Sequence, residues 1–329
     1  MKIHWFIGVD ISKKTFDGAI LSQNKSSKAV HARFDNTPSG YKDFKKWLTQ
    51  QCAKLSEVFV CMEHTGIYGL GLASFLEGTI AYCMENPLQV KRSLGIVRGK
   101  SDKVDAFMLA RYCYLHREEL KPTQLPTKTL QDLRILFSER ERIVKALQVE
   151  KAVLSELNPV LNEKTKGRLR ERMAGLKKDL GSVEKDLLEV VQSDPEIARN
   201  YKLATSVIGV GMVNALLFIM YSGNFEGITQ PRSFACYSGV APFEHTSGTS
   251  IRGKTRVSHL ANKQVKTQLT NAARSAVMND PELRRYYKRK RDEGKEHGVV
   301  MNAVKFKIIL RVYATVRRGT PFVRLRQAG

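Results

Sequence analysis

Residues 3–21, which read IHWFIGVDISKKTFDGAIL, decide the fold of the amino-terminal part of the chain. They hold two apolar runs, Ile3–Asp10 and Thr15–Leu21, on either side of a short polar turn. A third strand-like run, Lys28–Phe34, follows after another polar stretch. Apolar runs of this length between polar turns are typical of β-strands. The stretch therefore predicts a three-stranded meander.

After the meander, strand and helix patterns alternate. A helix is expected from Pro38, because Tyr41, Phe44 and Leu48 recur at helical spacing. Two apolar runs of strand length and two helix starts follow it: Glu57–Met62, Thr79–Met84, Asn86-Pro87 and Ser101-Asp102. A meander followed by alternating strands and helices is the order of the ribonuclease H-like fold. Residues 1–117 are therefore expected to form an α/β domain of that class.

The rest of the chain is predicted to be mostly helical. Residues 118–130 contain Pro122 and Pro126 and are expected to be a linker. Apolar residues then recur at steps of three and four through residues 130–154 and 169–190, which predicts a coiled-coil pair of long helices. Asn158-Pro159 is expected to break the pair into two arms. Periodicity does not distinguish a hairpin within one chain from a dimerisation coiled coil.

Residues 118–201 are therefore assigned to a linker and coiled-coil hairpin, and residues 202–329 to a mostly helical carboxy-terminal domain. In the latter, Ile208-Gly209-Val210-Gly211 lies between two apolar helical runs. It resembles a helix-hairpin-helix turn, which presents backbone N–H groups to a phosphate. A tight glycine turn within a small helical domain explains the same residues.

The charge of the chain points to a polyanionic partner. Its 329 residues include 55 Lys and Arg against 32 Asp and Glu, a net charge of +23. The longest apolar stretch, Val213–Tyr221, is far short of the roughly 20 residues that a membrane span needs, so nucleic acid is favoured over a membrane. No signal peptide is predicted. Five scattered cysteines without a CxxC pattern indicate a reducing cytosol.

The positive charge is concentrated at the carboxy-terminal end. Residues 251–329 hold 20 Lys and Arg and 5 Asp and Glu. Aromatic and aliphatic residues interleave with these charges, which favours helices with a basic face over a solvated tail. The predicted nucleic-acid-binding residues are Arg252, Lys254, Arg256, Arg284, Arg285, Lys288, Arg289, Lys290 and Arg291.

Four carboxylates are candidates for a metal site. Asp10 and Glu63 end two predicted strands, and they converge at one sheet edge if those strands are parallel neighbours. Asp102 and Asp105 are three residues apart in the first turn of a helix that Ser101 can cap. Four carboxylates form an oxygen cage suited to Mg²⁺, and two ions about 4 Å apart would promote phosphoryl transfer.

Each of these carboxylates also has a structural explanation. Asp102 and Asp105 suit the positive end of a helix dipole whether or not they bind metal. Glu63 could cap a following helix. Asp10 is the hardest to explain in this way, because an acidic residue that closes an apolar strand is costly unless it is used.

A serine-rich segment, residues 237–254, is the second candidate site. Ser247 stands in a glycine-flanked stretch that precedes Arg252 and Lys254, and cations suit a phosphate held near a hydroxyl. Serines in such loops usually form turns. A nucleophilic serine also needs activation, and no local base is evident. Ser250 and Ser238 are alternatives to Ser247.

Six blocks of the sequence carry a family resemblance: Gly8-Val9-Asp10, Met62-Glu63-His64-Thr65-Gly66, residues 100–106 (KSDKVDA), Ile208-Gly209-Val210-Gly211, residues 234–242 (FACYSGVAP), and Ser247-Gly248 with Arg252-Gly253. In this order they resemble the transposases of the insertion-sequence 110 family. The first three blocks correspond to the DEDD motif and the others to the carboxy-terminal transposase domain. His64 departs from the pattern, since a small residue is common after the motif glutamate.

The resemblance implies a RuvC-like domain joined to a serine-bearing domain. It implies that Asp10, Glu63, Asp102 and Asp105 bind Mg²⁺, as two ions, and that Ser247 attacks the DNA phosphodiester. It further implies a homo-oligomer (dimer or tetramer) and a structured bridge RNA that pairs with donor and target DNA. The setting would be the cytosol of a bacterium or archaeon, at the nucleoid.

Two alternatives from the residues remain. One is a RuvC-like nuclease or junction resolvase, which would use the carboxylates and water without a serine. The other is a non-catalytic nucleic-acid-binding protein. The presence of all four carboxylates argues against the second.

Overall fold

The computed structural model describes residues 3–23, 30–64, 66, 68–95, 101–247, 251–258 and 260–323. Packing divides the chain into two units, residues 1–125 and 126–329. The three-part division made from composition remains a prediction.

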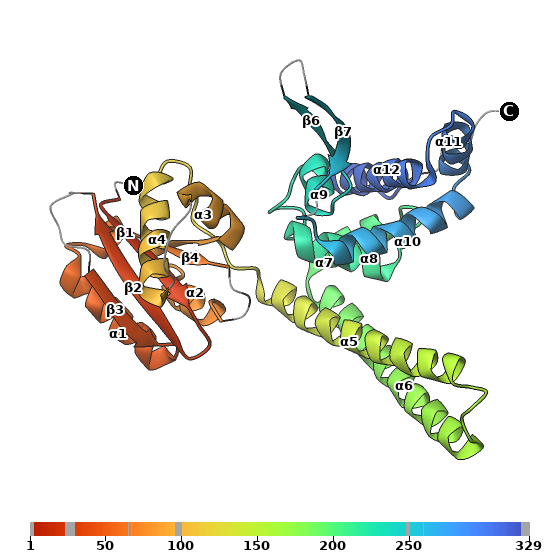
Figure 1. The fold of residues 1–329 in the computed structure, drawn as a ribbon, viewed down its shortest axis with the longest axis horizontal. Helices are drawn as coiled ribbons and strands as arrows, with labels where there is room; N and C mark the ends of the chain where they lie inside the picture. Colours follow the sequence, from red (N-terminus) through yellow and green to blue (C-terminus); the bar gives the residue numbers. More distant parts are fainter. Residues whose placement is uncertain are drawn as a thin grey trace. The chain divides into compact units, whose positions relative to one another are not determined.

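The first unit is built on a mixed five-stranded sheet (Figure 1). The strands are β1 (Trp5–Ile11), β2 (Thr15–Ser22), β3 (Val30–Asp35), β4 (Val58–Glu63) and β5 (Ala81–Glu85). Their order is β3-β2-β1-β4-β5, with the first three antiparallel and with β4 parallel to β1 and β5 parallel to β4. The predicted meander and the two later strands are thus confirmed.

Helices cover both faces of this sheet. They are α1 (Pro38–Gln51), α2 (Leu70–Leu76), α3 (Pro87–Leu94) and α4 (Asp102–Leu115), and a 3₁₀ turn, Leu55–Glu57, leads into β4. Because side chains alternate along a strand, one face packs on α1 and α2 and the other on α3 and α4. Phe44 and Val60 lie in the first core, and Cys61 and Leu109 lie in the second.

Gly8 lets helix α4 lie directly on strand β1. A Cβ at this position would come 2.0 Å from the carbonyl oxygen of Ala106 and 2.2 Å from the amide nitrogen of Ala110. Only glycine allows so close an approach of the two backbones. The same approach brings the amino-terminal turn of α4 to the end of β1, where Asp10 stands.

The second unit is mostly helical. Its helices are α5 (Lys128–Glu156), α6 (Glu163–Ser193), α7 (Pro195–Thr205), α8 (Met212–Ser222), α9 (Pro231–Tyr237), α10 (Lys263–Asn279), α11 (Pro281–Asp292) and α12 (His297–Arg318). Apolar side chains from all eight form one core, in which α8 is buried along almost its whole length. None of the helices in the described part of the chain is long and apolar enough to cross a membrane.

Helices α5 and α6 pack along each other (Figure 1). Arg140, which interrupts the apolar stripe, donates to Glu184 across the pair at 2.9 Å, and Arg172 of α6 donates to Glu150 of α5 at 3.0 and 2.9 Å. Apolar residues near the start of α5 and near the end of α6 lie in the core that the other helices share. Two long helices are therefore present, while their description as a coiled coil stays a prediction.

The glycine turn between α7 and α8 packs on another helix. Gly209 has φ of +91°, and a Cβ there would lie 2.6 Å from the carbonyl oxygen of Ala272 in α10. This close contact explains why a glycine stands at position 209. The predicted role of the turn in binding a phosphate stays a prediction.

The serine-rich segment differs from expectation, because its backbone forms strands. Strands β6 (Pro242–Ser247) and β7 (Ile251–Val257) pair as an antiparallel ladder, with Pro242 opposite Val257 and Ser247 opposite Ile251. The glycines and serines suggested a loop, whereas the β-branched residues on both sides of them favour strands.

Candidate functional site

Ionisable residues form a row across one face of the sheet in the first unit. Asp10 lies opposite Asp17, and Asp17 lies opposite Arg33. Val9 pairs with Met62, so Glu63 is next to Asp10 in line on the neighbouring parallel strand. Paired residues of neighbouring strands point to the same face. The row is therefore on the face that α4 covers.

Helix α4 brings two more carboxylates to this row. Its first turn contains Asp102 and Asp105, and the predicted N-cap is confirmed because the Ser101 hydroxyl accepts a hydrogen bond from the Val104 amide at 3.3 Å. Negative side chains are favourable at this end of a helix.

The four carboxylates that the sequence singled out line one cavity. It has a volume of about 550 Å³, and Asp10, Glu63, Asp102 and Asp105 are all in its wall. Lys91 of α3 also lines it, together with apolar residues of α3 and α4. Three separate elements, β1, β4 and α4, thus bring their acidic residues to one place.

The electrostatics of Asp10 reflect this crowding. Burial, followed by repulsion from Asp105, Glu63, Asp102 and Asp17, raises the pKa of Asp10 from 3.8 to about 6. Two or more carboxylates in one site favour the neutral form of one of them. A cation bound among them would reverse this effect.

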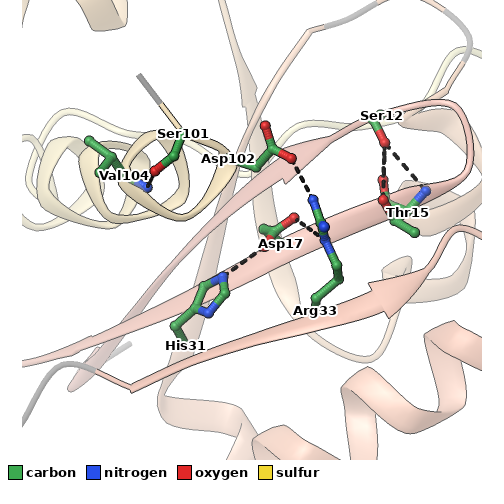
Figure 2. Close-up of polar contacts among 8 residues, drawn as sticks. All are labelled: Ser12, Thr15, Asp17, His31, Arg33, Ser101, Asp102 and Val104. Carbon is green, nitrogen blue, oxygen red and sulfur yellow. Dashed lines mark hydrogen bonds and ion pairs between the residues drawn. The ribbon is translucent and has the colours of Figure 1, made fainter. Parts of the chain in front are cut away.

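A charged network that the sequence analysis missed holds one side of the row (Figure 2). Asp17 is buried, and its two oxygens accept hydrogen bonds from His31 at 2.7 Å and from Arg33 at 3.0 Å. Arg33 also donates to Asp102, so its guanidinium joins the sheet to the start of α4. The antiparallel register of the meander was the signal that could have revealed it.

The donor chemistry of the cavity fits a hard divalent cation, because all four candidate ligands are carboxylates. Among the residues that the structure describes, however, no three His, Cys, Asp or Glu side chains converge closely enough to hold a metal ion. The Asp102 carboxylate is held in an ion pair with Arg33 of β3.

The three candidate serines are placed unequally. Ser247 ends β6, and its side chain lies outside the described residues, as does the whole of Ser250. Ser238 is fully buried and its hydroxyl donates to the Ala235 carbonyl at 3.3 Å, closing α9. A buried, hydrogen-bonded hydroxyl is poorly placed to meet a phosphodiester, which leaves Ser247 and Ser250 as the stronger candidates.

The predicted nucleic-acid-binding residues fall in two places. The backbones of Arg252, Lys254 and Arg256 form β7, but their side chains are outside the described part of the chain. The basic run of residues 284–291 lies on α11 as expected.

Several side chains of this run make local contacts. Arg284 donates to carbonyl groups at the end of α10, Arg291 donates to the Lys295 carbonyl, and Lys290 pairs with Glu293. Lys288 is exposed and, among the described residues, makes no ion pair or hydrogen bond. His64, just after β4, is exposed as well.

Two family models match the chain. The model of the DEDD transposases of IS110, described as a transposase, covers residues 7–159. A second, described as a transposase of the IS116/IS110/IS902 family, covers residues 201–288. Together they take in most of the sequence and both units of the structure.

Curated relatives agree with these models. The chain is 25% identical over 323 residues to the pilin gene-inverting proteins of Moraxella bovis and Moraxella lacunata, covering 96% of this chain and 97% of each relative. It is also 31% identical over 125 residues to an uncharacterized 43.6 kDa protein of insertion element IS110 from Streptomyces coelicolor, covering 38% of this chain and 31% of that protein.

Proposed function

The chain belongs to the IS110 family of transposases and is a DNA recombinase, and on this premise we propose that the four carboxylates of the first unit form its metal-dependent catalytic centre. The match to the DEDD model implies a ribonuclease H-like fold for that unit. DEDD transposases typically use a divalent metal.

The observation that carries the proposal is the crowding of acid around Asp10. Four carboxylates from three elements line one cavity, and burial, together with repulsion from the neighbouring carboxylates, raises the pKa of Asp10 to about 6. Such an arrangement destabilises the fold unless a positive charge is recruited, and perturbed carboxylates in a cavity are typical of functional sites.

The candidate ligands are Asp10, Glu63, Asp102 and Asp105, and Mg²⁺, as two ions, is the proposed metal. When bound, such ions stabilise charge on the attacking and leaving oxygens of a phosphoryl transfer. Two other residues of the protein position and partly neutralise these ligands. Arg33 neutralises the edge of the site by pairing with Asp102, and the short approach at Gly8 fixes α4 so that its aspartates face Asp10.

Ser247 is the proposed nucleophile. Its hydroxyl oxygen would bond to phosphorus as the bond to the leaving sugar oxygen breaks, the hydroxyl losing a proton and the leaving oxygen gaining one. The resulting phosphoserine link preserves the energy of the phosphodiester while strands are exchanged. Family resemblance and the place of Ser247 at the end of β6, before Arg252, support this role.

Donor and target DNA and a structured bridge RNA are the proposed partners, with a homo-oligomer, dimer or tetramer, as the active form in the cytosol. Support comes from the net charge of +23 and from the concentration of positive charge in residues 251–329. A protein that leaves sequence reading to base pairing needs mainly contacts to the nucleic-acid backbone. The two pilin gene-inverting relatives carry names that denote inversion of a DNA segment, which supports site-specific recombination by this chain.

A junction assay on the whole element in cells tests the proposal. Excised circles and inserted copies are counted by sequencing for the wild type, Asp102→Asn and Ser247→Ala, with protein levels measured in parallel. Asp43→Asn, an exposed aspartate of α1 outside the cavity, is the matched control. We expect Asp102→Asn and Ser247→Ala to lose all junctions while Asp43→Asn keeps them.

Two other outcomes of the junction assay would change the proposal. If only Asp102→Asn fails, Ser247 is not the nucleophile. Ser250→Ala then distinguishes the other candidate serine from a RuvC-like reaction with water. If Asp102→Asn recombines normally, the carboxylates are not the catalytic centre.

A further inference from the structure

A second cavity lies in the helical unit, at the foot of the β6–β7 hairpin, where Pro242 and Val257 pair. Its volume is about 900 Å³. The hairpin spaces Ser247 several residues away from this foot, at about 3.3 Å per residue. The cavity is therefore separate from the position proposed for the nucleophile.

Positive side chains from three helices line this cavity. They are Arg232 of α9, Lys266 of α10 and Lys305 of α12. No Asp or Glu is among the described residues of its wall. Burial, with repulsion from Lys266 and Arg274, lowers the pKa of Lys305.

Lys305 stands out because it is only 7% exposed. A buried ammonium without a counter-charge is costly. Another buried charge in the same unit does have a partner within the chain. Asp280 is 4% exposed and forms an ion pair with the guanidinium of Arg311. Among the residues that the structure describes, none forms a hydrogen bond or ion pair with Lys305, and this contrast favours an anion from outside the chain as its partner.

Apart from Asn302, the remaining side chains of the wall are apolar. Phe306 and Val299 line the cavity, and Val299 is 59% exposed. The Asn302 amide donates to the Val240 carbonyl at 2.6 Å, which ties α12 to the segment that leads into β6. Cations beside an aromatic and aliphatic surface suit a nucleotide, whose phosphate is charged and whose base is flat and largely apolar.

We propose that this cavity binds a backbone phosphate of a nucleic-acid strand through Lys305 and Lys266, with the adjoining nucleotide packed against Phe306 and Val299. The inference deepens the proposed function and rests only on the chain acting on DNA. It does not depend on the metal ions or on the serine, so the failure of either proposal is visible separately.

Fluorescence polarisation with the full-length protein tests it. The probes are a fluorescein-labelled single-stranded DNA, the matching duplex and an RNA of the same sequence, all at one fixed salt concentration. Lys305→Met removes the buried charge. Arg317→Met removes one exposed charge from the last turn of the same helix and is the control for general electrostatics.

We expect Lys305→Met to weaken binding of at least one probe by about tenfold or more, and Arg317→Met by no more than about threefold. Without nucleic acid, Lys305→Met should unfold at the same temperature as the wild type or higher, because the unpaired buried charge is gone. Weaker binding together with unchanged or higher stability separates a ligand contact from a folding role.

Lys266→Met, a partly buried variant that leaves Lys305 in place, decides the question if Lys305→Met does not fold. If binding of all three probes weakens, the site recognises the phosphate backbone of any nucleic acid. If binding of one probe alone weakens, that type of nucleic acid is the ligand. If both lysine variants bind every probe within about threefold of Arg317→Met, the proposal is wrong.

Discussion

The cavities of the two units carry opposite charge. In the first, acidic side chains outnumber the one lysine of the wall, Lys91, and in the second, the described wall residues include cations and no Asp or Glu. In the first, a sheet edge and a helix end bring four carboxylates together, and burial with repulsion among them raises the pKa of Asp10 to about 6. In the second, three helices surround a buried ammonium, Lys305, whose pKa is lowered by burial and by neighbouring cations. The first calls for a cation and the second for an anion.

The two cavities also differ in the elements that hold their side chains in place. The acidic cavity is fixed by strand register and by the contact of α4 with β1, so its geometry depends on very few residues. The basic cavity is assembled from three helices and a hairpin that share one core. Substitutions that move the first should therefore have large and local effects.

Gly8→Ala should have the largest effect. Its Cβ would overlap the backbone of Ala106 and Ala110, so α4 must shift away from β1. We expect a loss of about 3 kcal/mol in unfolding free energy and loss of most junction formation, measured by urea denaturation and by the junction assay.

Gly175→Ala is the matched control, because nothing lies within 4 Å of a Cβ there on α6. It should stabilise the protein by about 0.5–1 kcal/mol. If Gly8→Ala behaves like this control, the close packing of α4 on β1 does not position the acidic cavity.

The stability of the first unit should depend on pH through Asp10. Because the pKa of Asp10 is raised to about 6 in the folded state, protonation favours folding. The contribution is fully present below pH 3.8 and is lost as the pH rises through about 6. In EDTA-treated protein it should amount to about 1–2 kcal/mol after allowance for partial solvent exposure.

Asp10→Asn should remove this dependence, so the difference in unfolding free energy between wild type and variant should change between pH 4 and pH 7. Urea titrations at both values measure it. A constant difference would show that the pKa of Asp10 is not raised in the folded state.

Arg33 should have a smaller effect on metal affinity. Its guanidinium competes for Asp102, although both side chains are more than half exposed at 55% and 57%. Arg33→Gln should tighten Mn²⁺ binding by up to about fivefold, measured by calorimetry. It should also lower the unfolding temperature, because the buried Asp17 loses a donor.

Arg33→Lys retains the charge but not the fork that reaches two carboxylates, so it should give an intermediate Mn²⁺ affinity. Weaker Mn²⁺ binding in Arg33→Gln would mean that Arg33 supports the metal site instead of restraining Asp102.

Lys288→Met should have the smallest effect. This exposed lysine of α11 is expected to contact phosphate without reading sequence. Binding should weaken a few-fold at low salt, and the slope of log K against log salt should fall by about one. An unchanged slope would remove α11 from the nucleic-acid interface.

Much of the first unit could be predicted from sequence because apolar strand length and helix caps are local signals. The meander, the strand that ends in Glu63 and the Ser101 cap all follow from short runs of residues. The pairing of Arg33 with Asp17 and Asp102 could not be read in this way. It depends on the register of three strands and on where α4 begins.

The second unit was less predictable for two reasons. Glycine and serine around Ser247 obscured the β6–β7 ladder, whose strands are identified by pairing and not by propensity. Lys305 was one of 20 positive residues in the last quarter of the chain, and nothing local shows which of them is buried. That depends on how α9, α10 and α12 pack.

The most direct test of the acidic cavity as a metal-dependent catalytic centre is calorimetric titration of the purified full-length protein with Mn²⁺ at pH 7. The wild type is compared with Asp10→Asn, Asp105→Asn and the control Asp43→Asn. We expect saturable Mn²⁺ binding in the wild type and in Asp43→Asn, and at least about tenfold weaker binding in the other two variants. Equal Mn²⁺ affinity in all four proteins, or none in the wild type, would contradict it.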